Sequence, residues 1–173
     1  MGATAKKAPK ARTPPKTREL LADFTSVQLR RAAAVELQKR AARRAREKQA
    51  ARDLLALRHL THFVRTAWEV LEGKPLIWNW HLDLLCRELL SIYRKEPGYQ
   101  DTVICIPPGT MKSLLLCVFG PAWWWLHHPE ERWLFVSASG SVAKRDSRRM
   151  SRLMQRDFYQ RLIAANAEAG GPK

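Results

Sequence analysis

The stretch TVICIPPGTMKSLLLCVF, residues 102–119, decides the predicted fold. Residues 102–106 are β-branched or apolar and form a run of the length typical of a buried strand. A Pro/Gly loop follows over residues 107–110. From Lys112 to about His127 the chain is almost entirely apolar, which predicts a buried helix with a kink or restart at Pro121. The order is therefore strand, loop, helix.

A second strand is expected downstream, over residues 132–138 (RWLFVSA). Residues 139–141 predict a turn, and residues 142–168 predict one long, charged helix. The order strand, loop, helix, strand, helix predicts an α/β fold with a parallel sheet and right-handed crossovers. Two strands cannot form a stable open sheet alone, so the expected domain is only part of such a fold.

The junction of the first strand and its helix has the features of a phosphate-binding loop. Backbone N–H groups at a helix N-terminus bind anions, Lys112 would contact the β and γ phosphates, and the Ser113 hydroxyl would hold Mg²⁺ between them. In the common pattern G-x-x-x-x-G-K-[ST], the two glycine positions are Ile106 and Met111 here, so only the Lys-Ser pair matches. The alternative is a helix that starts with Lys-Ser by chance. The expected site for ATP and Mg²⁺ comprises Pro108, Gly109, Thr110, Met111, Lys112 and Ser113.

The front of the chain is strongly basic. The chain has 31 Lys and Arg against 16 Asp and Glu, a net charge of +15, and residues 1–60 hold 16 of the former and 5 of the latter. Residues 1–24 are expected to be a disordered basic tail, and residues 25–56 a basic helix that is polar all round. Such a segment favours a nucleic-acid partner, although a solvated charged face with no partner is the alternative. The candidate DNA-binding residues are Lys39, Arg40, Arg43 and Arg44.

The composition changes at Leu57, which marks the expected start of a folded domain over residues 57–173. Apolar residues at helical spacing predict a helix that ends at Gly73 and a second helix over residues 79–93. The three cysteines lie among apolar residues and show no metal-binding spacing, so buried reduced thiols are expected. No apolar run is long enough to span a membrane.

Five short segments, in the same order, resemble the N-terminal ATPase region of tailed-phage large terminase subunits. The resemblance covers about residues 57–165, and its most specific element is the loop 107–113, which resembles the family's Pro-Pro-Gly loops that end in Lys-Ser after a short apolar strand. The other segments are Trp80-His81 with Leu82 and Leu85, Pro121-Ala122-Trp123 with Pro129 behind it, Val136–Ser139 with Ala143, Ser147 and Arg148, and Asp157–Gln160.

This resemblance implies an ATP-binding motor domain that powers DNA packaging, encoded by a phage or prophage and located in the bacterial host cytoplasm. A full-length relative would be an ATPase and an endonuclease. The implied partners are double-stranded DNA, the small terminase subunit, the portal protein and further copies of the chain in a homo-oligomeric motor. Association with a membrane is not expected. By the same analogy Trp80 and His81 are candidates for the adenine side of the site. The alternatives are core packing for Trp80 and a surface or helix-capping role for His81.

The chain also departs from the family. Residues 107–111 contain no arginine, so an arginine finger would come from elsewhere, with Arg145, Arg148 and Arg149 as loose candidates. Residues 114–173 contain no apolar run that ends in paired acidic residues, and no carboxylate cluster for a two-metal nuclease. We therefore expect a truncated front part of a terminase, without the Walker B and nuclease parts and without robust ATP turnover on its own. The catalytic residues stay unassigned.

Two other functions compete with this reading. The chain could be a small basic phage DNA-binding protein whose loop is inactive, in which case replacing Lys112 would leave nucleotide binding unaffected. A small P-loop kinase is disfavoured, because the second loop glycine is absent and a basic front end has no role there.

Overall fold

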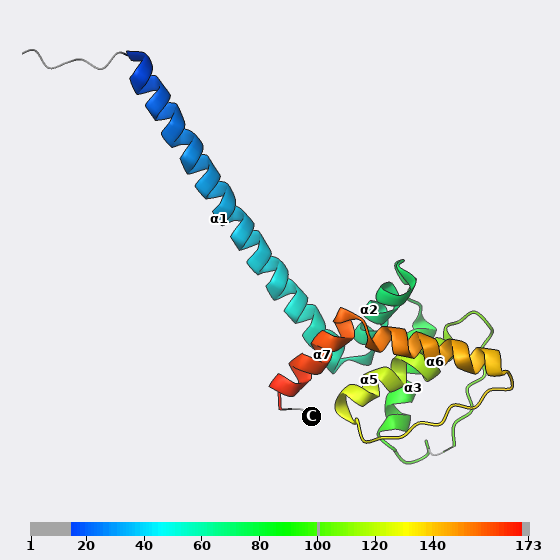
Figure 1. Ribbon diagram of the computed structural model, residues 1–173. Coiled ribbons are helices and arrows are strands. Elements are labelled where there is room, and N and C mark those ends of the chain that lie inside the picture. Colours follow the sequence, from blue (N-terminus) through cyan, green and yellow to red (C-terminus); the bar gives the residue numbers. More distant parts are fainter. Residues whose placement is uncertain (1–14, 100, 171–173) are drawn as a thin grey trace, which may run out of the picture. The chain divides into compact units, whose positions relative to one another are not determined.

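The computed structural model describes residues 15–99 and 101–170, with side chains from residue 26 onward. In this described part all regular secondary structure is helical, and no strand is present (Figure 1). The expected α/β fold with a parallel sheet is therefore wrong. The elements are α1 Pro15–Arg58, α2 Leu60–Glu72, α3 Trp80–Tyr93, α4 Lys112–Leu114, the π-helical turn η1 Leu115–Phe119, α5 Gly120–His127, α6 Gly140–Met154 and α7 Asp157–Glu168.

The two expected strands are extended segments without a partner. No backbone–backbone hydrogen bond of the described chain involves residues 102–106 or 132–138. Each segment turns some side chains to the core, such as Ile104 and Trp133, while Val103 and Leu134 remain 87% and 89% exposed. An apolar run reveals that a segment has a side to bury, but a strand also needs a neighbouring strand with which to exchange hydrogen bonds. That second condition is not met here.

The chain divides into two units, residues 1–47 and 48–173, and helix α1 runs through the division. The expected tail overlaps this helix, which already begins at Pro15, while residues 1–14 lie outside the described residues. Proline suits the first turn of a helix, because its missing N–H has no partner there in any case. From Val27 to Glu47 every side chain is exposed, so this part of α1 depends on the high helix propensity of its Ala, Leu, Gln, Arg and Lys residues.

The second unit is built around the continuous helical run of α4, η1 and α5. Its side chains are buried in several directions, with Leu115, Val118, Phe119 and Ala122 completely inaccessible. Helices α2, α3, α6 and α7 all pack against this run (Figure 1). The central helix is thus the core element that the amphipathic helices cover.

The irregularity expected at Pro121 is a π-helical turn. Pro121 has no N–H to donate to the carbonyl four residues earlier, and the helix widens over the preceding residues, where the Gly120 N–H donates to the Leu115 carbonyl. The proline thus lies in the first turn of the regular helix α5, where a missing N–H does no harm.

The C-terminal end of α1 is held against α5. The indole N–H of Trp123 donates to the carbonyls of Ala56 and Leu57, at 3.0 and 3.1 Å. His127 Nε2 lies 2.9 Å from the Leu57 carbonyl, and because a carbonyl only accepts, His127 carries its proton on Nε2. These side chains satisfy carbonyls that the end of a helix leaves without partners. Burial lowers the pKa of His127, which favours the neutral ring at this position.

The long helix expected over residues 142–168 is broken into α6 and α7. Arg156 adopts an extended conformation between them. The break lets Phe158 and Tyr159 reach the core, where Phe158 packs 5.7 Å from Phe63 and the Tyr159 hydroxyl donates to the Ala122 carbonyl at 2.7 Å. The expectation of one helix was wrong because tertiary burial of these two rings outweighs helical continuity. In the described part of the chain no helix is both long enough and apolar enough to cross a membrane.

Gly120 gives a test of this packing. A β-carbon at Gly120 would collide with the Tyr93 hydroxyl and would lie 2.9 Å from the Leu115 carbonyl, whereas at Gly140 it would meet open space. We expect Gly120→Ala to lower the free energy of unfolding by about 1–3 kcal/mol through overpacking. Gly140→Ala is the matched control and should not lower it. Urea unfolding measures both, and equal midpoints for the two variants would contradict this account of the core.

Candidate phosphate-binding site

The loop that precedes the central helix is tightly turned. It joins the extended residues 102–106 to Lys112, and the Thr110 hydroxyl donates to the Pro107 carbonyl across it at 2.7 Å. Gly109 and Met111 both have left-handed backbones, with φ of 84° and 64°. Pro108 and Gly109 are exposed, so the outer side of the loop is accessible to a ligand.

The backbone conformation of Met111 links this loop to the phosphate-loop pattern. A side chain at positive φ costs roughly 1–2 kcal/mol, and glycine is the residue that avoids this cost. Met111 stands at the second glycine position of the phosphate-loop pattern, directly before Lys112. The loop thus adopts a left-handed turn at this position even though the glycine is missing. Packing of the Met111 side chain against the core offsets the strain.

The first turn of the helix that follows the loop has backbone N–H groups with no backbone acceptor among the described residues. Met111, at the N-cap, makes no side-chain hydrogen bond, and the first backbone acceptor of the helix is its own carbonyl, which receives the Leu115 N–H at 2.9 Å. The N–H groups of Lys112, Ser113 and Leu114 belong to the first turn and have no backbone acceptor within the described residues. Three donors and the positive end of the helix dipole therefore face the loop.

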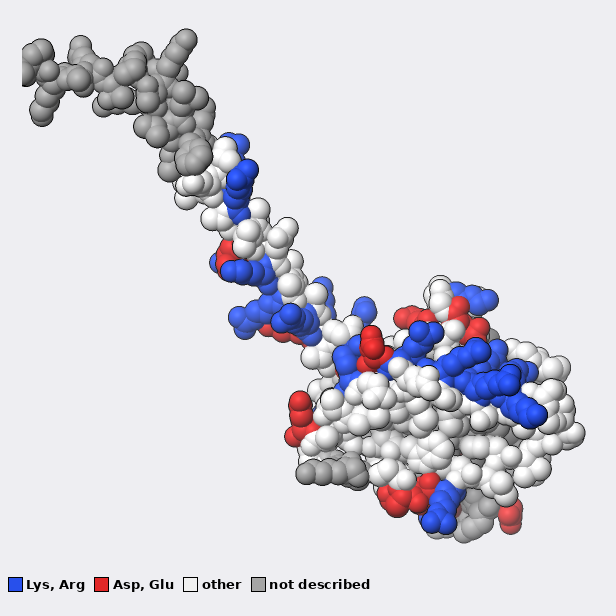
Figure 2. Space-filling view, viewed as in Figure 1, with Lys and Arg blue, Asp and Glu red and all other residues white. Residues whose placement is uncertain are grey.

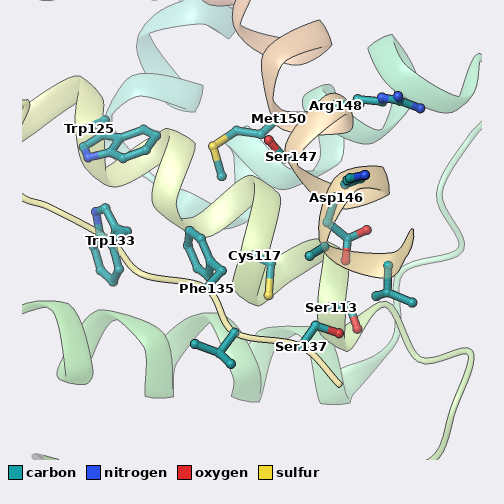
Figure 3. A pocket seen from close by; sticks show the side chains of 14 residues that line it. Ser113, Cys117, Trp125, Trp133, Phe135, Ser137, Asp146, Ser147, Arg148 and Met150 are labelled. Atoms are coloured by element: carbon teal, nitrogen blue, oxygen red, sulfur yellow. The ribbon is translucent and has the colours of Figure 1, made fainter. Parts of the chain in front are cut away.

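A hollow of about 790 Å³ lies beside the loop, and Ser113 forms part of its wall. Figure 3 shows Ser113, Ser137 and Asp146 toward one end of the hollow, and Trp125 and Trp133 toward the other. The walls come from the central helix, from α6 and from the extended residues 132–138. The hollow therefore combines a polar end next to the loop 107–111 with an aromatic end.

Asp146 is the only acidic residue among the described residues that line the hollow. It is buried, and both of its carboxylate oxygens accept hydrogen bonds from the guanidinium of Arg145, at 2.8 and 3.1 Å. Burial, with a smaller contribution from Asp146, raises the pKa of the neighbouring Cys117 thiol. The described residues contain no group of three His, Cys, Asp or Glu side chains that could hold a metal ion. A Mg²⁺ ion at Ser113 would depend on phosphate oxygens and water for its remaining ligands.

The two candidates for the adenine side lie at the start of α3. Trp80 is 72% exposed, His81 is partly buried, and their rings meet edge to face at 6.2 Å. Neither residue lines the hollow, and no hydrogen bond, ion pair or ring contact joins them to the loop in the described residues.

Among the three consecutive tryptophans, Trp123 and Trp124 are buried, and Trp125 lines the hollow and donates to the Glu131 carbonyl at 2.8 Å.

Sequence reasoning missed the inward position of Asp146, which falls within the charged helix expected over residues 142–168. Asp146 shares a face of α6 with Met150 and Leu153, both buried, so its helical spacing to these residues was the available signal. The loose arginine-finger candidates Arg145 and Arg149 are engaged in ion pairs with Asp146 and Glu72.

The candidate DNA-binding residues lie on α1, in the first unit. Arg40 pairs with Glu36 at 3.4 Å and Arg43 pairs with Glu47 at 2.9 Å, each within one turn of the helix. Lys39 and Arg44 have no ion-pair partner among the described side chains. Exposed pairs of this kind contribute little to stability, so all four side chains remain accessible to an anionic partner.

Comparison of the chain with protein-family models, with curated proteins and with solved structures gave no significant match. The resemblance to large terminase subunits therefore rests on the residues themselves.

The reactivity of the three cysteine thiols tests how deeply each is buried, including Cys117 in the wall of the hollow. Cys105 is exposed, Cys117 is partly buried in the wall of the hollow, and Cys86 is buried, which raises the pKa of its thiol to about 12. Alkylation proceeds through the thiolate, so at pH 8 we expect Cys105 to react first, Cys117 more slowly and Cys86 last. Peptide mapping by mass spectrometry after timed exposure to iodoacetamide gives the order. Reaction of Cys86 as fast as Cys105 would contradict the packing of α3.

Proposed function

We propose that the loop 107–113 binds the phosphate groups of a nucleoside triphosphate, and that the chain is an ATP-binding part of a phage DNA-packaging terminase large subunit. The observation that carries the proposal is the left-handed backbone of Met111 directly before Lys112. A strained residue at a sequence position that matches a phosphate-loop glycine is a reason to infer a function for the loop.

Each part of the loop has a role in this proposal. The N–H groups of Lys112, Ser113 and Leu114 would donate to phosphate oxygens, and the Lys112 ammonium would neutralise the β and γ phosphates. The Ser113 hydroxyl would supply one ligand to a Mg²⁺ ion that the phosphates and water complete. Trp80 and His81 are not assigned to the adenine, because neither lines the hollow beside the loop.

The proposal concerns binding and not turnover by this chain. Hydrolysis in this class of enzyme needs a carboxylate at the metal and a second acidic residue or amide to orient water. Among the described residues, the only carboxylate in the wall of the hollow belongs to Asp146, and each of its oxygens already accepts a hydrogen bond from Arg145. In the packaging motor, the bound nucleotide would power translocation of double-stranded DNA together with further subunits.

Replacement of Lys112 tests the nucleotide site. A hydrogen bond to a charged group contributes about 1.5–3 kcal/mol. We therefore expect Lys112→Ala to weaken binding of Mg²⁺-ATP about 10- to 100-fold in isothermal titration calorimetry. Lys74→Ala is the matched control, because Lys74 is exposed and has no ion-pair partner among the described residues. Unchanged affinity in the Lys112 variant, or no binding by the wild-type chain, would overturn the proposal.

A second function, binding of double-stranded DNA, is supported by the exposure of α1. Seven basic and two acidic residues lie between Val27 and Glu47, all exposed, and both acidic residues are paired with arginines. The other basic side chains of this segment have no acidic partner among the described residues of the unit. The unpaired basic residues are Arg30, Arg31, Lys39, Arg44 and Arg46. An exposed cationic helix is suited to contact phosphates without reading sequence.

Neutral substitutions on α1 test this second function. We expect Lys39→Gln, Arg44→Gln and Arg46→Gln together to reduce affinity for a mixed-sequence duplex and its dependence on salt, because fewer counterions are released. Glutamine preserves helix propensity, and Arg44→Lys with Arg46→Lys is the charge-preserving control. Fluorescence anisotropy over a salt series measures both. Equal salt dependence in the neutral variant and the wild type would remove α1 from the DNA-binding surface.

A further inference from the structure

Helix α6 carries a row of basic side chains along one face. Five of its residues are Lys or Arg, and at 3.6 residues per turn these five fall within an arc of about 140°. Its only acidic residue, Asp146, lies on the opposite, buried face with Met150 and Leu153. The basic residues are Lys144, Arg145, Arg148, Arg149 and Arg152.

Three of these side chains are free to meet a ligand. Arg145 is held by Asp146, and Arg149 lies 3.6 Å from Glu72 of α2. Lys144, Arg148 and Arg152 are exposed and have no ion-pair partner in the described residues. They recur every fourth residue, so they follow one another along the helix at intervals of about 6 Å. We call these three residues the α6 stripe; Figure 2 shows a band of basic side chains over this helix.

The α6 stripe stands on a well-packed support. Leu153 is completely buried, Met150 is buried, and α6 packs against both α2 and η1. The Arg149–Glu72 pair further ties the helix to α2. The three cations are therefore presented from a fixed backbone, which reduces the entropy lost when they order on a ligand.

We propose that the α6 stripe binds the phosphate backbone of double-stranded DNA, as a contact surface separate from α1. This inference rests on the DNA-binding part of the proposed function. The chemistry of the stripe favours phosphate, because two of its three cations are guanidinium groups, which bind phosphate oxygens with two parallel hydrogen bonds. With no acidic side chain on its exposed face, the helix does not repel a polyanion.

An anionic membrane surface is the main competing partner, and the structure disfavours it. A helix that lies on a membrane inserts its apolar face between the lipids. The apolar face of α6, with Met150 and Leu153, is already buried against the rest of the second unit. Only the charged face remains, which fits a hydrophilic polyanion such as nucleic acid.

The test compares two triple variants that remove the same charge. The first is Lys144→Gln, Arg148→Gln and Arg152→Gln, in the full chain. The control is Lys74→Gln, Arg87→Gln and Arg132→Gln, which removes three exposed basic residues outside α6. Each phosphate contact contributes about 0.9 to the slope of log K against log salt, so loss of three contacts should reduce the slope by about 2.7. The control variant should keep the wild-type slope. Circular dichroism confirms that both variants remain helical.

Three outcomes would overturn the inference. Equal losses in both triple variants would mean that only net charge matters. An unchanged α6 variant, combined with a weakened α1 variant, would leave α1 as the DNA-binding surface and remove α6. Failure of the wild-type chain to bind duplex DNA, with α6-dependent binding to phosphatidylserine vesicles instead, would replace DNA by a membrane. Retained Mg²⁺-ATP binding in that last case would show that the phosphate-loop proposal stands by itself.

Discussion

The second unit depends on the burial of one helical run, Lys112–His127. Its side chains are apolar in every direction, so no single partner can cover it, and α2, α3, α6 and α7 pack around it. Polar atoms at its borders are satisfied by specific side chains, as when Trp123 donates to the end of α1 and Asn166 donates to the Leu126 carbonyl. The proline in this run is accommodated by a π-helical turn and not by a break, because a break would expose the residues that the other helices cover.

The candidate site follows from the same constraint. The loop 107–111 ends where this buried helix begins, so Lys112 and Ser113 are presented from the element around which the other helices of the unit pack. Packing of Met111 against the core stabilises its left-handed backbone, which turns the chain sharply into the helix. Burial of the central helix thus positions both the free N–H groups and the wall of the hollow. A site on such an element requires little rearrangement to bind an anion.

Sequence patterns predicted the helices well and the sheet wrongly. The helix over residues 79–93 and the buried helix from Lys112 are present, because amphipathic or continuous apolar spacing is a local property. The two expected strands are extended but unpaired, since pairing depends on a neighbour that no local pattern reveals. The break between α6 and α7 depends on where Phe158 and Tyr159 find space. For the candidate site, the sequence predicted that a buried helix begins at Lys112 and Ser113, whereas the inward position of Asp146 depends on the packing of α6 against the core.

The central claim is that backbone N–H groups at the start of the buried helix bind phosphate. The most direct measurement is a nuclear magnetic resonance titration of the ¹⁵N-labelled chain with Mg²⁺-ATP, read at the backbone amides. The account predicts the largest shifts at the donor amides of Lys112, Ser113 and Leu114 and at the adjoining loop residues Gly109, Thr110 and Met111, because these amides lie on or next to the bound phosphates. Shifts confined to the basic residues of α1 and α6, with the loop amides unchanged, would contradict it and would show that ATP binds only as a general anion.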